Sequence, residues 1–259
     1  MTDLVLLDRD GAIAKVTLNQ PAKLNAVNNA MWRRLRELFA EFDADEGLRC
    51  VILTGATERA FSVGADISEF EDNRSTVDKA RRYHERTHAA MHAIMHCRHP
   101  VIAQIRGLCV GGGLELATIC DLRICGASAR FGIPVTRLGL VVSYTELKPL
   151  LDLVGPANAL EILLEGQLHG APEALRMGLV NRVVADEEVE RETLATAARI
   201  AEGAPLVARW HKRFTRRLMQ PAPLSDQEMD ESFHCFGTED FRAGYQAFLA
   251  KTKPEFRGR

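Results

Sequence analysis

The chain has 259 residues, of which 46% are hydrophobic and 26% charged, and its formal net charge is −2. This composition is typical of a soluble globular protein, and the near-neutral charge argues against a broad surface for nucleic acid or membranes. The N-terminus lacks the features of a signal peptide and no apolar run reaches the length of a membrane span, so we expect a cytoplasmic protein or an organelle protein without its transit peptide.

The first part of the chain has clear strand and helix periodicities around an Asp10-Gly11 turn, which is typical of a hairpin. Its expected elements, in chain order, are strands at 4–7 and 13–18, a helix at 28–42, a strand at 50–54, a loop at 60–69, an exposed polar segment at 71–79 and a helix at 77–97.

The second part alternates strands and helices and then becomes entirely helical. A strand at 101–105 precedes a glycine-rich turn, a helix at 114–120 and a short strand at 122–125. The alternation indicates an α/β core, which we place at residues 1–188, and a helical region at 189–259 that prolines divide into separate helices. Six cysteines without paired CxxC spacing are expected to be mainly buried thiols in a reducing compartment.

The stretch Gly111-Gly112-Gly113-Leu114-Glu115 is the most informative motif. It follows an apolar strand and opens a helix, so unpaired backbone N–H groups at the helix start can point to an oxygen that becomes negative. Glycines allow a ligand to approach the backbone closely, and Glu115 places a carboxylate beside that oxygen. Such a combination suits a reaction that passes through an enolate.

A second segment, Ala60 to Ile67, also follows an apolar strand. Together with the glycine motif, it resembles the crotonase superfamily, the enoyl-CoA hydratase/isomerase group. Nearly the whole chain takes part in this resemblance, and further matching segments lie at 20–26, 100–103, 173–181 and 241–256. The resemblance implies a spiral of β-β-α units, with C-terminal helices that pack between subunits of a homotrimer or a dimer of trimers.

The resemblance also implies roles for individual residues. The backbone amides of Ala65 and Gly112 would form an oxyanion hole for a thioester carbonyl, and Glu115 would match the first of two glutamates that hydratases use. Val135 occupies the place of the second glutamate and cannot exchange a proton. We therefore do not expect efficient hydration by the usual pair of glutamates, since an acid–base group is worth about 10²–10⁴ in rate.

The loop after Val135 departs from the glycine-rich pattern of the family. Glu146 is a candidate replacement acid, and the alternative is an exposed helix carboxylate that faces Lys148 or Lys212. Tyr144 would either shape the acyl cavity and donate a hydrogen bond or be a packed aromatic residue with a solvated hydroxyl.

The segments around the two family motifs are expected to bind the CoA thioester, which is the substrate, with no tightly bound cofactor and no metal. The expected contacts are Lys23, Leu24, Ala26, Ala65, Asp66, Ile67, Ser68, Gly112, Val135 and Tyr144, and basic residues near Lys251 and Lys253 are candidates for the phosphates.

Four histidines at four-residue spacing, His84, His88, His92 and His96, share one face of a predicted helix. This spacing can hold a metal ion. Because no acidic ligand set accompanies it, a lining role for some of them beside the acyl pocket is the preferred interpretation.

These observations predict an acyl-CoA enzyme of the hydratase/isomerase type that stabilises a thioester enolate. Two alternatives remain at this point. A proline–valine pair and a non-glycine loop also resemble methylmalonyl-CoA decarboxylases, and the absence of a second glutamate is compatible with a non-catalytic acyl-CoA binder.

Overall fold

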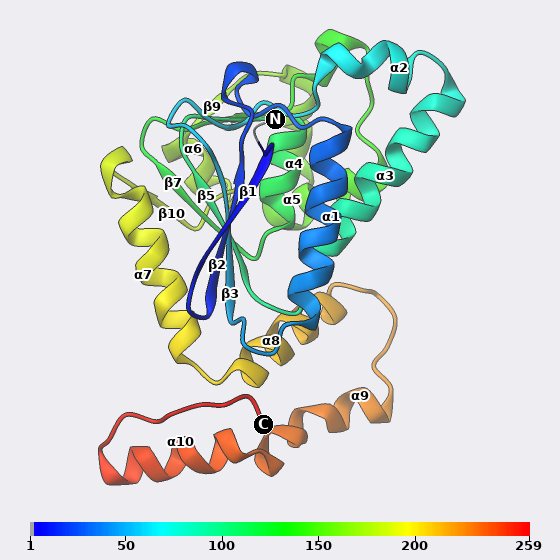
Figure 1. Ribbon diagram of the computed structural model, residues 1–259. Coiled ribbons are helices and arrows are strands. Elements are labelled where there is room, and N and C mark those ends of the chain that lie inside the picture. The colour runs from blue at the N-terminus through cyan, green and yellow to red at the C-terminus, as the bar shows by residue number, and fades with distance from the viewer. Residues whose placement is uncertain (1–2) are drawn as a thin grey trace.

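Two β-sheets organise the fold in the computed structural model, which describes residues 3–259 (Figure 1). The larger sheet contains β1 (Val5–Asp10), β2 (Ile13–Leu18), β3 (Cys50–Gly55), β5 (Val101–Ile105), β7 (Leu122–Gly126) and β10 (Arg182–Val184), in this order. The smaller sheet contains β4 (Ala60–Ser62), β6 (Leu108–Val110), β8 (Arg130–Gly132) and β9 (His169–Gly170).

The helices connect or cover these sheets. They are α1 (Asn29–Ala44), α2 (Phe70–Arg74), α3 (Val77–His96), α4 (Gly112–Ile119), α5 (Tyr144–Glu165), α6 (Ala171–Arg176), α7 (Val189–Glu202), α8 (Pro205–Leu218), α9 (Asp226–Asp230) and α10 (Glu239–Ala250). Within residues 3–259, no helix combines the length and the apolar character that a membrane span requires.

Consecutive strands alternate between the two sheets, which produces the expected spiral. β3, β5 and β7 lie parallel in the larger sheet, and the strands that follow them, β4, β6 and β8, lie parallel to one another in the smaller sheet, where β9 pairs antiparallel with β8. A helical segment follows each strand pair. The predicted α/β class with β-β-α units is thus confirmed, as is the N-terminal hairpin of β1 and β2.

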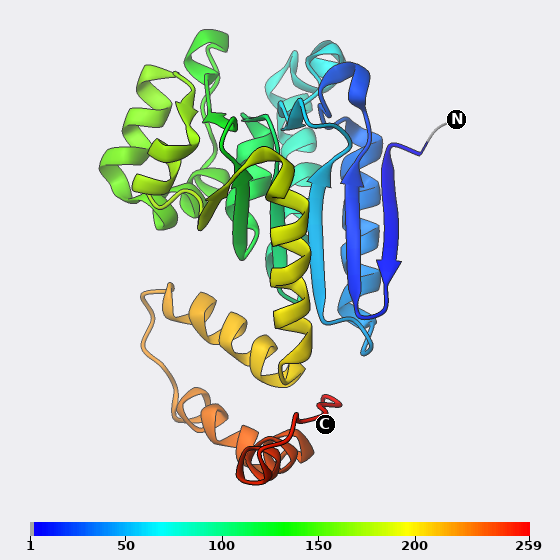
Figure 2. The same cartoon turned by 90° about the vertical axis from the view of Figure 1, so that its left-hand side faces the viewer.

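The central strands of the larger sheet are buried on both faces, whereas the edge strand β1 is mostly exposed, and side chains alternate between the faces along each strand. On β3, Val51 and Leu53 belong to the main core with α1 and α3, whereas Cys50 and Ile52 face a second cluster that includes Ala197 of α7. Figures 1 and 2 show α7 along the face of the sheet opposite α1. Continuous apolar strands are expected when a parallel sheet is covered on both sides.

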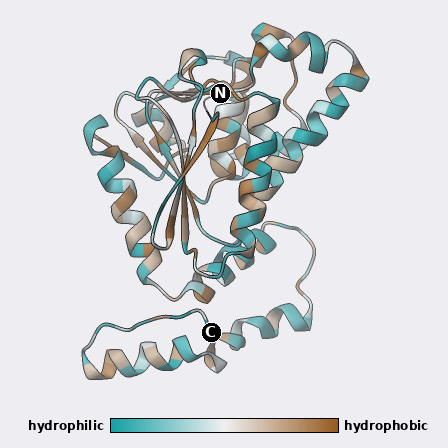
Figure 3. Cartoon of the chain, viewed as in Figure 1, coloured by the Kyte–Doolittle hydropathy of each residue, from teal (hydrophilic) through white to brown (hydrophobic). Residues whose placement is uncertain are grey.

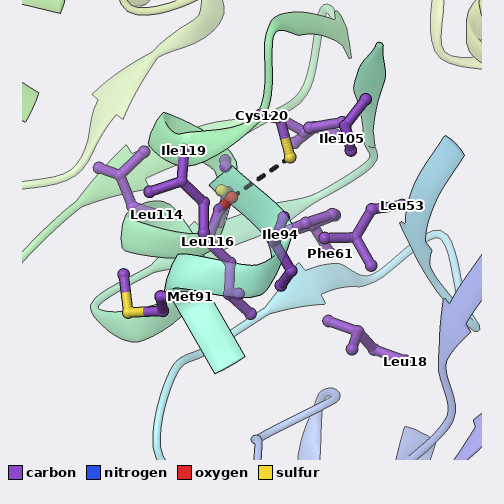
Figure 4. Close-up of a cluster of buried hydrophobic side chains, with 14 of the residues drawn as sticks. Leu18, Leu53, Phe61, Met91, Ile94, Ile105, Leu114, Leu116, Ile119 and Cys120 are labelled. Atoms are coloured by element: carbon purple, nitrogen blue, oxygen red, sulfur yellow. Dashed lines mark hydrogen bonds between the residues drawn. The ribbon is translucent and has the colours of Figure 1, made fainter. Parts of the chain in front are cut away.

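The main core extends beneath α4, the helix that opens at the glycine motif. In Figure 4, Leu114 and Leu116 of α4 lie near Met91 and Ile94 of α3, all of them buried. The thiol of Cys120 donates a hydrogen bond of 3.3 Å to the Leu116 carbonyl. The start of α4 is therefore held by a closely packed helix, which fixes the position of its first amides.

The polar segment at 71–79 is mostly exposed, as predicted, and it is helical over most of its length. It contributes most of α2 and the start of α3, and Asn73 is buried. Arg74 is only partly exposed. The prediction fails mainly at these two residues, because Asn73 hydrogen-bonds to Glu69 and Arg86, and the guanidinium of Arg74 packs on aromatic rings.

The helices after α7 form an arm that extends from the sheets, as Figures 1 and 2 show. Asp121 anchors α8 by ion pairs with Lys212 at 2.7 Å and Arg216 at 2.8 Å. Apolar residues remain exposed on the arm (Figure 3). Phe233 and Phe236 precede α10, and α10 itself carries Phe241, Tyr245, Phe248 and Leu249. The helical region begins near residue 189 as expected, although α7 covers the sheet; the division at 188 stays a prediction.

Candidate active site

A cavity of about 190 Å³ lies where the glycine motif meets the loop after β4. Six sequence-predicted site residues line it: Ala65, Ile67, Gly112, Glu115, Val135 and Glu146. The other lining residues are Trp32, Val63, Phe70, Arg74, Tyr83, Thr87, Met91, Val110, Gly111, Pro134, Leu138, Leu140, Val141 and Val142. The wall is thus mainly apolar, with a few polar groups, as is usual for a small-molecule site.

Two glycines bring the loops of this cavity into close contact. Gly64 has a φ of +95°, and a Cβ at this position would lie only 2.7 Å from the Gly112 nitrogen. A Cβ at Gly113 would lie 2.3 Å from the carbonyl oxygen of Ser62. Only glycine satisfies these demands, so Gly64 and Gly113 are required by the close packing of the two backbones against each other.

The amides of Ala65 and Gly112 are neighbours and are unpaired. A Cβ at Gly112 would lie 3.5 Å from the Ala65 nitrogen. Within residues 3–259, neither amide donates a hydrogen bond, whereas the adjacent Asp66 and Gly111 amides are bonded to Val27 and Gly132 carbonyls. Gly112 is the first residue of α4, where an amide has no partner in its own helix. Two free donors therefore lie at the wall of one cavity.

Glu115 is one turn into α4 and its carboxylate is close to these amides. Its Oε2 would lie 3.6 Å from a Cβ at Gly112. Burial, together with the neighbouring charge of Glu146, raises the pKa of Glu115 to about 8, and Arg74 opposes this shift. A carboxyl whose pKa is near neutrality can exchange a proton under physiological conditions, which is a property of catalytic acids and bases.

Glu146 reaches the same cavity from the first turn of α5. The N-cap residue Ser143 donates hydrogen bonds to its Oε2 from the backbone nitrogen at 3.1 Å and from the hydroxyl at 2.6 Å. The Ser143 hydroxyl in turn accepts from the Glu146 amide at 3.4 Å, which completes a capping box. One carboxylate oxygen is thus fixed by the cap, while the other lies 3.9 Å from His84 Nδ1. Lys148 and Lys212, the partners expected for an exposed Glu146, do not bind its carboxylate. Lys148 pairs with Asp152 and Lys212 pairs with Asp121.

Arg74 is a site residue that the sequence did not reveal. Its guanidinium lies 4.6 Å from the ring centre of Phe70 and 4.3 Å from that of Tyr83. The Tyr83 hydroxyl accepts a hydrogen bond of 3.2 Å from the Trp32 indole, and both of these aromatic residues are buried. The spacing of Phe70 and Arg74 by one helical turn was the available signal, but it was hidden in a segment interpreted as exposed.

The predicted CoA-binding segment lies beside the cavity rather than in its wall. Lys23 Nζ contacts Asp66 at 2.7 Å and the Ser68 hydroxyl at 2.8 Å. Burial favours a higher pKa for Asp66, but these hydrogen bonds hold its pKa below the ordinary value. Leu24 adopts a left-handed φ of 51°, and Ala26 is buried next to it. This cluster ties the 21–26 segment to the loop that carries the Ala65 amide.

Two further expectations differ from the structure. Tyr144 is 91% exposed and does not line the cavity, because its side chain leaves the first turn of α5 on the solvent side. The histidine stripe lies outside the cavity wall as well. Neighbouring rings contact one another, with centres 4.1 Å apart for His92 and His96, and His84 meets Glu146. Among residues 3–259, no cluster of ligands suitable for a metal ion is present.

Comparisons with known proteins agree with these observations. The family model for enoyl-CoA hydratase/isomerase matches residues 8–259. The chain is 35% identical to a short-chain-enoyl-CoA hydratase of Clostridium acetobutylicum over 97% of its length and 96% of the relative. It is 33% identical to a crotonyl-CoA hydratase of Syntrophomonas wolfei, with 97% of each chain covered.

Solved structures support the same assignment. An enoyl-CoA hydratase/carnithine racemase from Magnetospirillum magneticum superimposes with a TM-score of 0.98 at 47% identity, covering 100% of this chain and 97% of the other. Enoyl-CoA hydratase from Bacillus anthracis gives a TM-score of 0.93 at 29% identity, with 99% and 100% covered. Sequence, fold and cavity thus lead to one conclusion: the chain belongs to the enoyl-CoA hydratase/isomerase family of the crotonase superfamily, and is an enzyme of this type.

Proposed function

We propose that this enzyme adds water across the double bond of short-chain 2-enoyl-CoA thioesters. The thioester oxygen would accept hydrogen bonds from the amides of Ala65 and Gly112. These donors stabilise the negative charge that develops on this oxygen when a nucleophile attacks the β-carbon, and one such donor is typically worth about 10²–10³ in rate. The pair of unpaired amides at one cavity wall is the observation that carries the proposal.

The two carboxyl groups would transfer the protons of the reaction. Ionised Glu115 removes a proton from water as its oxygen bonds to the β-carbon, and the electron pair of the double bond moves toward the thioester oxygen. In the reactive form the single proton of the two carboxyl groups is on Glu146 and Glu115 is ionised, so when the enolate collapses the α-carbon takes the proton of the Glu146 carboxyl group. Water is added as a whole, and a final proton exchange with solvent restores both carboxyl groups. Glu146 of α5 thereby replaces the glutamate that the family pattern would place at Val135.

The size of the cavity supports a short acyl chain. Its volume of about 190 Å³ is below the range of about 300–1,000 Å³ that is usual for pockets of drug-sized ligands. The Clostridium and Syntrophomonas relatives are named for short-chain and crotonyl substrates, which is consistent with this choice.

The experiment is the hydration of crotonyl-CoA, followed by the loss of the conjugated enoyl absorbance. We expect turnover, and a decrease of kcat/KM by about 10²–10⁴ in Glu115→Gln. Parallel incubations with a 3-enoyl-CoA and with methylmalonyl-CoA test the two other reactions. Turnover of only the 3-enoyl or only the methylmalonyl thioester would replace hydration by isomerisation or decarboxylation, and tight crotonyl-CoA binding without any turnover would indicate a binding protein.

We further propose that the protein forms a homotrimer or a dimer of trimers. The exposed apolar residues of the arm support this, with Phe248 83% and Leu249 75% exposed. An apolar surface of this kind on a folded chain is typical of a subunit interface. Sedimentation of a single species at the monomer mass of 28.7 kDa would contradict the proposal.

A further inference from the structure

The position of Arg74 indicates which acyl groups the cavity accepts. Its guanidinium carbon lies over the ring of Phe70 and over the ring of Tyr83, at 4.6 and 4.3 Å from their centres. Cation–π contacts of this kind orient a guanidinium by its face. The N–H groups lie in the guanidinium plane, so their edge remains available to a ligand in the cavity.

Arg74 is held in this position by a hydrogen-bonded network behind it. The side-chain amide of Asn73 donates a hydrogen bond to the Glu69 carboxylate at 3.3 Å. The same carboxylate accepts a hydrogen bond from the backbone N–H of Asn29 in α1 at 3.0 Å. Arg86 of α3 donates to the Asn73 side-chain oxygen at 3.0 Å. These hydrogen bonds hold the short helix α2 against α1 and α3. They thereby fix the backbone from which the Arg74 side chain extends.

Arg74 forms no close ion pair in the described part of the chain, although its charge acts on Glu115 at longer range. Across residues 3–259, Arg74 takes part in no ion pair, and its Nε is buried without a hydrogen-bond partner. Glu115 and Glu146 line the same cavity, but neither forms a salt bridge with it. A buried, unpaired donor is unfavourable unless a ligand satisfies it.

A planar acceptor with two oxygens fits this donor best. Guanidinium groups bind carboxylates through two parallel N–H···O bonds, which are stronger than bonds between neutral groups. A simple alkyl chain would place methyl or methylene groups against the cation and leave it desolvated. A carboxylate at the far end of a short acyl chain would instead pair with it.

We propose that the physiological substrate is a short-chain enoyl-CoA whose acyl group ends in a second carboxylate, and that Arg74 binds that carboxylate. This inference rests on the proposed function only in that the cavity holds the acyl group. It concerns substrate choice, so Arg74 is assigned no proton transfer. The thioester end would still meet the Ala65 and Gly112 amides.

The test measures binding instead of turnover, with saturated thioesters that cannot be hydrated. Glutaryl-CoA carries the terminal carboxylate, and butyryl-CoA lacks it. Titration calorimetry at about pH 6.5 keeps Glu115 protonated, since the pKa of this group is about 8. We expect the wild-type enzyme to bind glutaryl-CoA more tightly than butyryl-CoA, and Arg74→Met to lose about 10- to 100-fold in glutaryl-CoA affinity while butyryl-CoA binds within about threefold of wild type.

Two further variants complete the design. Arg74→Lys keeps the charge but not the paired N–H groups, and should retain part of the preference. Arg81→Met removes an exposed arginine that pairs only with Asp78 on α3, and should change neither affinity. Circular dichroism and thermal unfolding check that each variant is folded.

The outcomes separate this inference from the proposed function. Equal affinity of the wild-type enzyme for the two thioesters would overturn the inference, as would equal losses for both in Arg74→Met. Either result leaves crotonyl-CoA hydration as a separate question. Conversely, a glutaryl-CoA preference that depends on Arg74 supports the inference even if crotonyl-CoA is not hydrated.

Discussion

The two walls of the cavity are built by different means. On one wall, the loop after β4 and the start of α4 present backbone amides, and Gly64 and Gly113 are needed because no Cβ fits between the two backbones. On the other wall, α2 and α5 present the side chains of Arg74 and Glu146. The first wall therefore tolerates almost no substitution at these glycines, whereas single substitutions can change the side chains of the second wall.

This difference separates the general part of the chemistry from its specific part. Backbone donors stabilise the oxyanion of any thioester, so the glycine wall suits the common intermediate of the family. In the two proposals above, side chains on the opposite wall choose the acyl group and supply a second acid. A change on the glycine wall should therefore affect every substrate, and a change on the other wall only some steps or substrates.

The largest effect is expected from a substitution of Gly64, on the wall that presents the backbone amides. Gly64→Ala would place a Cβ 2.7 Å from the Gly112 nitrogen at a φ of +95°, so the two amides must move apart. We expect kcat/KM for crotonyl-CoA to decrease by about 10²–10³. Gly11→Ala is the matched control, because Gly11 also has a positive φ of +54° but has free space around it and lies in the β1–β2 turn. Similar kcat/KM losses in both variants would mean that backbone strain alone is responsible.

A smaller effect is expected from the side-chain wall. Glu146→Gln keeps the size of the side chain but removes its exchangeable proton, and kcat/KM should decrease by about 10². Glu228→Gln is the control for loss of a cap, since Glu228 forms the same capping box with Ser225 on α9, outside the cavity, and also pairs with Arg217. If both variants lose stability and Glu146→Gln retains full activity, Glu146 is only a helix cap.

The smallest expected effect concerns stability and its dependence on pH. Burial raises the pKa of Glu115 from 4.5 to about 8, so the folded chain retains a proton that the unfolded chain releases. The contribution of this group to the free energy of unfolding is therefore complete below about pH 4.5 and is lost as the pH rises through about 8.

Glu115→Gln removes this pH dependence. Relative to wild type, the variant should gain about 1–3 kcal/mol in the free energy of unfolding at about pH 9 and little at about pH 5. Urea unfolding of both proteins at the two pH values measures the difference. A gain that is the same at both would show that the Glu115 carboxyl is not desolvated in the folded protein.

Much of this protein could be predicted from residue patterns. The Asp10-Gly11 turn predicted the hairpin, the alternation of strands and helices predicted the α/β core, and the glycine triplet predicted the start of α4. These features depend on local backbone conformation and on alternation along a strand, which neighbouring residues in the sequence determine.

The rest required the packing of distant segments. Arg74 and Tyr144 show this most clearly: the first was expected to be exposed and lines the cavity, and the second was expected in the cavity and is 91% exposed. The direction of a helical side chain depends on how the helix is rotated against its neighbours, and hydrogen bonds such as those of Asn73 set that rotation. The sequence by itself therefore determined the fold and indicated the two amides, those of Ala65 and Gly112, that we propose as the oxyanion hole. Only the tertiary structure decided which charged side chains face the acyl group, because that choice depends on contacts between helices far apart in the chain.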